Sequence, residues 1–206
     1  YYYMNDIYNL FPEPIVSYTL GREFTSTEKN ALLSQDWGRS EGNKTSKNTF
    51  VLDKKNLENI RNFILSSLTD FGKRVYEFDD EETKLYITQS WMNRTMPGEF
   101  HHPHKHPNSI VSGTFYIETN DLDIIRFEKP GSDTSPWLFM PKEWNPWNSS
   151  TWVLPVVKGQ LLLWRSYLPH SVPCTKGPNA RYSLSFNTFV RGDIGGEYEL
   201  SRLSLK

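Results

Sequence analysis

The chain has 206 residues, which is long enough for one large domain with a substantial hydrophobic core. Its 23 basic and 24 acidic residues give a formal net charge of −1, so it lacks the basic excess that binding to bulk nucleic acid requires. No segment approaches the roughly 18 apolar residues of a membrane span. The single cysteine, Cys174, excludes an intramolecular disulfide framework. We therefore expect a cytoplasmic protein with no membrane partner.

The N-terminal part, about residues 1–80, is predicted to be helical. Residues 25–28 (Thr-Ser-Thr-Glu) have the pattern of a capping box ahead of a helix over about residues 26–35. The Gly-, Ser- and Asn-rich stretch 38–48 is predicted to be a loop, and Asp53 is expected to cap a second helix. That helix carries an apolar stripe at helical spacing, formed by Leu57, Ile60, Ile64, Leu68 and Phe71.

From residue 84 the hydrophobic pattern changes to a period of two, which is typical of strands. The predicted strands cover residues 85–93, 111–117, 123–128, 152–157, 160–164 and 181–190. Short β-segments broken by Pro and Gly, with almost no helix between them, favour an antiparallel barrel or jelly roll. No linker or internal repeat divides the chain, so we predict a single domain.

Two of these strands carry a polar face. The polar residues are Ser112, Thr114 and Tyr116 in one strand and Arg181, Ser183, Ser185 and Asn187 in the other. These faces are either the solvated exterior of an antiparallel sheet or the lining of a lumen that binds a polar ligand. The alternation by itself slightly favours the exterior.

Four of the five histidines lie between residues 101 and 106. On an extended backbone, residues two apart point the same way, so His104 can share one metal ion with His106 or with His102. Imidazole suits Fe, Zn, Cu and Ni. Taken in isolation, the cluster fits equally well a solvated loop that binds metal only adventitiously.

The fifth histidine, His170, precedes a turn signal at residues 176–179 (Lys-Gly-Pro-Asn), and Arg181 follows that turn. We expect the turn to bring His170 and Arg181 opposite each other across an antiparallel pair. One strand would then offer a metal-binding imidazole and its neighbour a guanidinium that clamps a carboxylate, assisted by Ser183. A metal beside a carboxylate clamp suits a chelating keto acid. Alone, Arg181 is more often a surface ion pair and His170 a core histidine.

These motifs resemble those of the 2-oxoglutarate/Fe(II)-dependent oxygenases, and in particular a branch with a Pro-Gly-x-Phe-x-x-x-His-x-His-Pro-x-Ser segment. That segment here spans residues 97–109, and the resemblance continues at 10–14, 112–116, 158–164, 168–173 and 181–187. It implies a single mainly β domain over residues 1–206. The expected fold is a double-stranded β-helix (a jelly-roll or cupin-like barrel) over about 84–192, with two N-terminal α-helices packed outside.

The resemblance also implies an enzyme, a dioxygenase that uses Fe(II), 2-oxoglutarate and O2, with ascorbate as reductant. It would hydroxylate an unknown small molecule or side chain and release succinate and CO2. Carried over, His104 and His170 would bind the metal, and Arg181 with Ser183 and Tyr116 would bind 2-oxoglutarate.

One position departs from the superfamily pattern. The residue two positions after the first histidine is usually a carboxylate, and here it is His106. We expect His106 to be the third metal ligand. The alternatives are His102, water or a distant carboxylate.

Substrate contacts are expected in the lumen from Asn108, Thr114 and Asn187. The Pro-broken segment 130–152 holds four of the seven tryptophans, which are Trp137, Trp144, Trp147 and Trp152. Such a segment is either a substrate-binding lid, with Trp144 and Trp147 as contacts, or a loop whose tryptophans pack on the barrel.

Two other hypotheses explain part of the pattern. A non-catalytic cupin-type barrel that binds a metal or another ligand would account for the histidines but would leave Arg181 without a role. A three-histidine dioxygenase that does not use 2-oxoglutarate would account for His106. The oligomeric state does not follow from the sequence.

Overall fold

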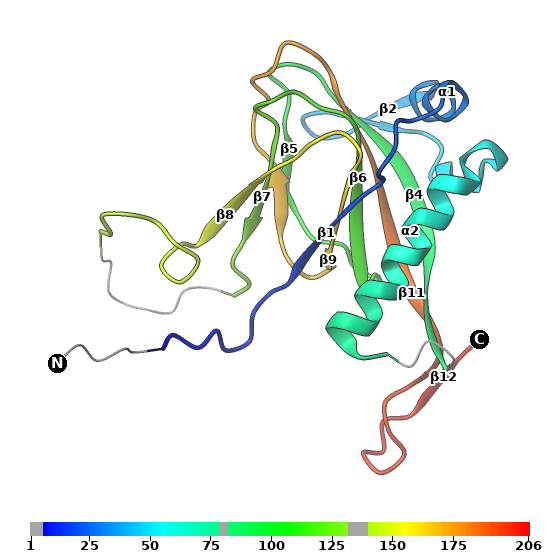
Figure 1. The fold of residues 1–206 in the computed structure, drawn as a ribbon, viewed down its shortest axis with the longest axis vertical. Helices are drawn as coiled ribbons and strands as arrows, with labels where there is room; N and C mark the ends of the chain where they lie inside the picture. The colour runs from blue at the N-terminus through cyan, green and yellow to red at the C-terminus, as the bar shows by residue number, and fades with distance from the viewer. Residues whose placement is uncertain (1–5, 79–81, 132–139) are drawn as a thin grey trace.

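The computed structural model describes residues 6–78, 82–131 and 140–206, and its main feature is a pair of antiparallel sheets (Figure 1). The larger sheet has the strand order β1-β9-β6-β11-β4-β3-β2, and β12 also pairs with β11. Its strands are β1 (Ile15–Thr19), β2 (Trp37–Arg39), β3 (Lys44–Ser46), β4 (Thr83–Thr95), β6 (Val111–Glu118), β9 (Gln160–Arg165), β11 (Arg181–Ile194) and β12 (Leu203–Leu205).

The smaller sheet has the order β5-β10-β7-β8. Its strands are β5 (His101–His104), β7 (Ile124–Glu128), β8 (Thr151–Pro155) and β10 (His170–Val172). Because the chain crosses repeatedly between the two sheets, this is the predicted mainly β double-stranded β-helix.

Two α-helices cover the face of the larger sheet that points away from the smaller one (Figure 1). They are α1 (Ser26–Leu33) and α2 (Glu58–Phe71). The capping box ahead of α1 is confirmed, since the Glu28 amide donates to Thr25 Oγ1 at 3.1 Å and the Thr25 amide donates to Glu28 Oε2 at 2.8 Å. The apolar stripe of α2 is fully buried and shares one core with Phe115, Leu184 and Phe186 of the sheet. No helix of the described residues has the length and apolar character needed to cross a membrane.

Two predictions for the N-terminal part were wrong. The stretch 38–48 is not a loop throughout, because β2 and β3 form a hairpin there that extends the larger sheet beside β4. Pairing with an existing sheet edge outweighs the weak strand propensity of this Gly- and Asn-rich sequence. Asp53 does not cap α2. It ends the 3₁₀ turn η1 (Val51–Asp53), a second turn η2 (Lys55–Leu57) follows, and Leu57 is the N-cap residue.

A further helical turn follows the C-terminal end of α2. Gly72 is the C-cap residue, and the chain continues through a π-helical turn, η3 (Gly72–Tyr76), before Glu77 takes a left-handed conformation. The chain therefore stays helical for one further turn beyond the end of α2.

Gly113 in β6 is required by close packing against its neighbours. A Cβ atom at this position would lie 2.3 Å from Phe186 Cζ and 2.6 Å from Leu163 Cδ2, and both neighbours are fully buried. We expect Gly113→Ala to lower the free energy of unfolding by about 1–3 kcal/mol, as overpacking does. Urea unfolding monitored by circular dichroism measures this. Gly38→Ala, where the nearest atom is 3.6 Å from the added Cβ, is the control. An equal loss in both variants would contradict the packing explanation.

Candidate metal centre

A pocket with about 440 Å³ of empty space, part of it open to solvent, lies between the two sheets. Both sheets contribute polar side chains to it. Its lining consists of Asn43, Trp91, Asn93, Thr95, His101, His104, His106, Thr114, Ile125, His170, Ser171, Val172, Arg181, Ser183 and Ser185. The polar faces of β6 and β11 therefore line a lumen through Thr114, Arg181, Ser183 and Ser185, and are not a solvated exterior.

Three histidines converge at one point of this pocket. One ring nitrogen from each of His104, His106 and His170 lies within 4.8 Å of the other two, and the Nε2 atoms of His106 and His170 are 3.3 Å apart. His104 of β5 stands opposite His170 of β10 in the strand register, and His106 follows two residues after the end of β5. The fold thus brings together the three histidines that were predicted from the sequence as metal ligands.

Hydrogen bonds from the ring nitrogens orient two of these imidazoles. His104 Nδ1 is 2.8 Å from the His102 carbonyl oxygen, and His170 Nδ1 is 3.1 Å from the Leu168 carbonyl oxygen. Because a carbonyl only accepts, each Nδ1 carries the proton and each Nε2 keeps its lone pair. This is the arrangement that orients histidines at metal sites.

Burial keeps these imidazoles neutral. Desolvation, with a contribution from the neighbouring His104, lowers the pKa of His106 to about 4. Desolvation also lowers the pKa of His104 and, more strongly, that of His170. Since a metal ion binds the neutral form of imidazole, the pocket holds the three rings in the protonation state that coordination requires.

The same pKa shifts predict acid sensitivity of the metal-free protein. Burial, followed by the neighbouring histidines, lowers the pKa of His101 from 6.5 to about 3. Between these values the unfolded chain binds a proton that the folded chain does not, so stability rises with pH. We expect the free energy of unfolding of the metal-free protein to fall as the pH is lowered from about 6.5 towards 3. Urea titrations at a series of pH values, with chelator present, measure it. His101→Asn should flatten the dependence, and an unchanged slope would contradict the assignment.

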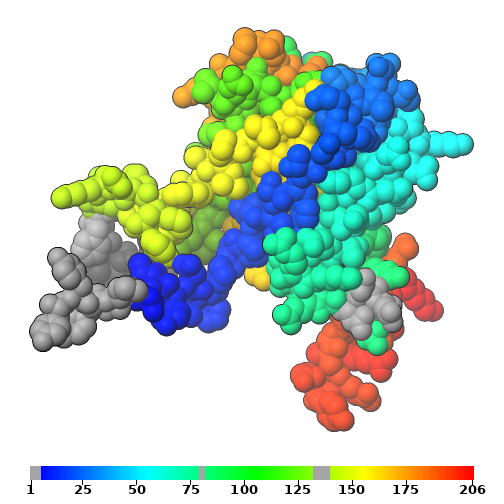
Figure 2. All heavy atoms as spheres, in the orientation of Figure 1, coloured from blue at the N-terminus to red at the C-terminus, as the bar shows by residue number. Residues whose placement is uncertain are grey.

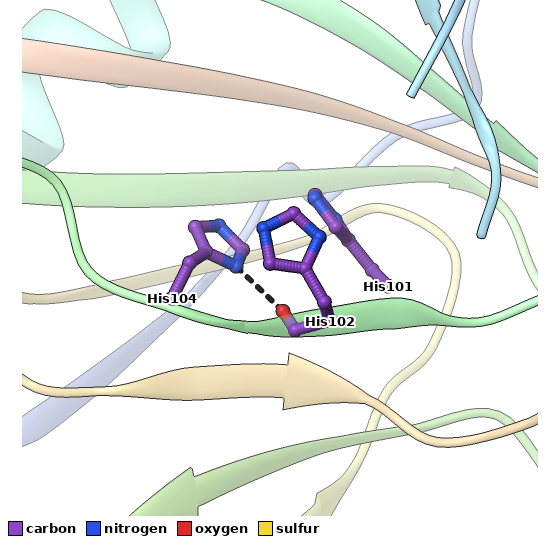
Figure 3. Close-up of side chains that lie close together, drawn as sticks. All are labelled: His101, His102 and His104. Atoms are coloured by element: carbon purple, nitrogen blue, oxygen red, sulfur yellow. Dashed lines mark hydrogen bonds between the residues drawn. The ribbon is translucent and has the colours of Figure 1, made fainter. Parts of the chain in front are cut away.

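A second group of histidines overlaps the first. His101, His102 and His104 all belong to β5, and one ring nitrogen from each also lies within 4.8 Å of the other two (Figure 3). The dashed line in Figure 3 is the bond from His104 Nδ1 to the His102 carbonyl, which leaves only Nε2 of His104 for a metal. One nitrogen serves one ion, so the two groups are alternatives. The group with His170 is the more enclosed, since His170 is 6% exposed.

Arg181 is a buried cation in the same pocket. It is 3% exposed, its Nη1 donates to the Ile124 carbonyl at 3.2 Å, and its Nε has no hydrogen-bond partner. None of the ion pairs formed by the described residues involves it. A buried charge without a counter-ion is costly, so this guanidinium is arranged for an anionic ligand. Ser183, two residues on, lines the pocket beside it.

The predicted pairing of His170 with Arg181 was wrong. His170 lies in β10, which pairs with β5 and β7, whereas Arg181 begins β11, which pairs with β4 and β6. Residues 173–180 cross from one sheet to the other instead of forming a hairpin. The two side chains still line one pocket, which they approach from opposite sheets.

Tyr116 lies beneath the guanidinium. The Arg181 guanidinium carbon is 5.1 Å from the centroid of the Tyr116 ring, and this tyrosine is fully buried. Burial raises the pKa of Tyr116 to about 12 despite the adjacent cation. A neutral phenol therefore supports Arg181 from the core side, whereas the pocket surface itself is formed by other residues.

Of the three substrate contacts predicted in the lumen, only one lines the pocket. Thr114 lines the pocket and its hydroxyl lies 3.1 Å from that of Ser185. Asn108 is exposed at a turn with a φ of 56°, a conformation that Asn tolerates, and does not line the pocket. Asn187 accepts a hydrogen bond from the Ser112 hydroxyl at 3.5 Å and is not among the lining residues.

Trp144, Trp147 and Trp152 of segment 130–152 do not line the pocket. Trp144 and Trp147 are 59% and 56% exposed, and Trp147 Nε1 donates to Asn9 Oδ1 at 2.8 Å. Figure 2 shows residues 140–150, in yellow-green, projecting from the body of the barrel. Trp137 lies outside the described residues, and the assignment of this segment to substrate stays a prediction.

Several lining residues, among them Trp91, Asn43 and Asn93, were not predicted as part of the site. Trp91 stacks on His106 with 5.8 Å between ring centroids. Asn43 and Asn93 are 4% and 5% exposed, and each has a side-chain oxygen without a hydrogen-bond partner. Trp91, Asn93 and Thr95 occupy alternate positions of β4, so the period of two in the sequence was the signal that places them on one face.

Comparison with known proteins agrees with this geometry. The family model described as "Putative 2OG-Fe(II) oxygenase" matches residues 89–187, which include the three convergent histidines and Arg181. No curated protein matches the chain in sequence.

Solved structures share the fold at low sequence identity. A 2OG-Fe(II) oxygenase family oxidoreductase from Burkholderia pseudomallei has a TM-score of 0.58 and 13% identity, over 84% of this chain and 83% of its own. HygX from Streptomyces hygroscopicus, with nickel and 2-oxoglutarate bound, has a TM-score of 0.56 and 11% identity, over 85% and 82%. A Pseudomonas putida prolyl-4-hydroxylase has a TM-score of 0.51 and 13% identity, over 85% and 92%. The family match covers the pocket residues and the barrel shares its fold with these proteins, so both comparisons support a 2OG-Fe(II) oxygenase.

Proposed function

We propose that this oxygenase binds Fe(II) through His104, His106 and His170 and binds 2-oxoglutarate through Arg181 and Ser183. It uses O2 to hydroxylate a small molecule or a side chain, and releases succinate and CO2. The observation that carries the proposal is the convergence of three neutral imidazoles in one pocket with a buried guanidinium that forms no ion pair with any of the described residues.

The residues present fit an iron ion. Imidazole nitrogens are ligands that Fe accepts, and at least two of the rings already hold Nδ1 in a hydrogen bond, which leaves Nε2 for the metal. Among the described residues, the ligand group contains three imidazoles and no carboxylate. His106 thus takes the place that a carboxylate has in the usual facial triad.

The pocket also fits a dianionic keto acid. Arg181 offers donors in a fork that matches a carboxylate, and the Ser183 hydroxyl stands on the same face of β11. When bound, the metal and the keto acid supply the O2 chemistry that attacks a C–H bond. The chain's own contribution is to orient the keto acid and to limit water through Trp91, Ile125 and Val172 at the pocket wall.

Turnover without a primary substrate tests the proposal. Purified protein with Fe(II), ascorbate and 2-oxoglutarate should form succinate slowly, and boiled protein should not. The three-histidine set also suits a dioxygenase that uses no keto acid, although that reaction leaves Arg181 without a ligand. O2 consumption that is independent of 2-oxoglutarate would favour that second function, and the absence of both reactions together with failure to retain Fe(II) would contradict the proposal.

We further propose that residues 1–206 act as one domain and work in the cytoplasm. The helices and the larger sheet share one buried core, and the single cysteine fits a reducing compartment. One cooperative unfolding transition and recovery in the soluble cell fraction are expected. Two separate transitions, or recovery in the membrane fraction, would contradict these statements.

A further inference from the structure

Two buried asparagines of the pocket each keep an amide oxygen that has no hydrogen-bond partner among the described residues. Asn43, just before β3, is 4% exposed, and Asn93 of β4 is 5% exposed. Asn93 Nδ2 donates to Ser185 Oγ at 2.9 Å, and Asn43 Nδ2 donates to Thr95 Oγ1 at 3.5 Å. Each side chain therefore uses its NH2 group on a hydroxyl and leaves Oδ1 as an unpaired acceptor. Such a buried acceptor is costly unless a donor meets it.

The backbone, and not the side chain, holds Asn43 at the pocket. The preceding Gly42 has a φ of 86°, and a Cβ atom there would lie 2.7 Å from the Phe100 carbonyl oxygen. The Phe100 amide donates to the Gly42 carbonyl at 3.1 Å, and the Ser40 amide donates to the Asn43 carbonyl at 3.2 Å. Phe100 directly precedes β5, so this turn is fixed against the smaller sheet. The Asn43 amide oxygen is thus presented in advance and stays available for a ligand.

The proposed keto acid does not satisfy these two oxygens. In the strand register, Asn93 of β4 stands opposite Ser183 of β11. Thr95, whose hydroxyl accepts from Asn43, stands opposite Arg181. Both asparagines therefore lie beside the proposed carboxylate clamp, but 2-oxoglutarate is a dianion that carries only acceptors. The donor comes from another molecule, and the reaction brings the compound to be hydroxylated into this pocket.

The charge of the pocket narrows the class of that donor. None of the described residues that line it is acidic, and Arg181 is a buried cation. The charges of Fe(II) and of the 2-oxoglutarate dianion cancel. An ammonium group would therefore lose its hydration without gaining a negative partner. An uncharged hydroxyl or amide N–H group donates to the two oxygens without that cost.

We propose that Asn43 and Asn93 form a subsite that recognises an uncharged hydrogen-bond donor, a hydroxyl or carboxamide group, on the compound that is hydroxylated. The inference rests on the proposed function, because it assigns the substrate class of the same pocket. The subsite determines specificity, since a compound that lacks the donor leaves two buried acceptors unpaired.

The binding of two small probes of similar shape tests the inference. Acetamide donates through its NH2 group, whereas acetone has a methyl group in its place and donates nothing. The protein is loaded with 2-oxoglutarate and with Co(II), which is paramagnetic, and the relaxation of the methyl protons of each probe is measured by NMR. We expect acetamide to bind about 3- to 10-fold more tightly than acetone, which is the net contribution of about one hydrogen bond.

Substitutions show whether this preference belongs to the two asparagines. Asn43→Leu and Asn93→Leu replace the amide by an apolar group of similar size and should each reduce the preference for acetamide. Asn43→Asp introduces a carboxylate and should make methylammonium bind more tightly than acetamide, a gain that a misfolded variant does not produce. Asn30→Leu removes an exposed asparagine of α1 that does not line the pocket, and this matched control should keep the preference.

The outcomes separate this inference from the proposed function. If the natural protein binds Co(II) and 2-oxoglutarate but binds acetamide no better than acetone, the inference fails and the proposed function stands. A preference that persists unchanged in both leucine variants also overturns the inference. If the natural protein binds neither Co(II) nor 2-oxoglutarate, the proposed function fails and the inference fails with it.

Discussion

Arg181→Ala is expected to weaken 2-oxoglutarate binding to the metal-loaded protein by about 100-fold, which corresponds to about 3 kcal/mol. The guanidinium is 3% exposed, and in the pocket it is the buried cation that has no counter-ion among the described residues. Losing one partner of a desolvated charge pair typically costs roughly 2–5 kcal/mol. Isothermal titration of the metal-loaded protein with 2-oxoglutarate gives the affinity directly.

Two further variants show whether the effect belongs to this site. Arg191→Ala removes an exposed arginine from the same strand, where the guanidinium stacks on Tyr86, and should leave keto acid binding unchanged. Arg181→Lys keeps the charge but not the fork, so an intermediate affinity is expected. If Arg181→Ala binds the keto acid as tightly as the natural protein does, the carboxylate clamp is elsewhere.

His170→Ala is expected to reduce metal affinity by more than about 100-fold. Loss of an outer-shell partner of a metal-binding histidine costs up to roughly 100-fold, and this substitution removes a ligand itself. His170 is the most enclosed of the three histidines, and Trp164 packs edge-on against it with 4.7 Å between ring centroids. Fe(II) retained after gel filtration under anaerobic conditions, measured by elemental analysis, checks the result.

His102→Ala is the matched control for this loss. His102 belongs to the alternative histidine group but not to the set with His170, and its side chain is 36% exposed. We expect its removal to change metal affinity only a few-fold. The opposite result, a loss in His102→Ala and none in His170→Ala, would place the ion at His101, His102 and His104.

Short sequence patterns correctly predicted those elements that depend on residues within the same helix. The capping box at Thr25 and Glu28 and the stripe of α2 are signals within one helix, and both are confirmed. The hairpin of β2 and β3 was missed because its stability comes from pairing with β4, about fifty residues away along the chain. Short strands of this kind depend on a partner that their own sequence does not reveal.

The candidate site was predictable to the extent that it depends on alternation. The period of two places His104 and His106 on the same side, and it predicts that Arg181 and Ser183 share one face of β11. The expected hairpin was wrong because residues 173–180 change sheets, and a turn signal does not distinguish a hairpin from a crossover.

Pro-rich, aromatic segments are harder to interpret from sequence. The position of Trp144 and Trp147 outside the pocket depends on how far the segment after β7 extends from the barrel, and composition does not determine that. Their exposure does make them available for contact with another molecule. Their assignment to substrate stays a prediction.

The central claim is that three imidazoles and Arg181 form one site for a metal and 2-oxoglutarate. A crystal structure of the protein with Ni(II), which stands in for Fe(II) without turnover, and 2-oxoglutarate tests this claim most directly. The expected result is a nickel ion bound by the Nε2 atoms of His104, His106 and His170, with the distal carboxylate of the keto acid on Arg181 and Ser183. A nickel ion bound by His101, His102 and His104, or a keto acid that does not contact Arg181, would contradict it.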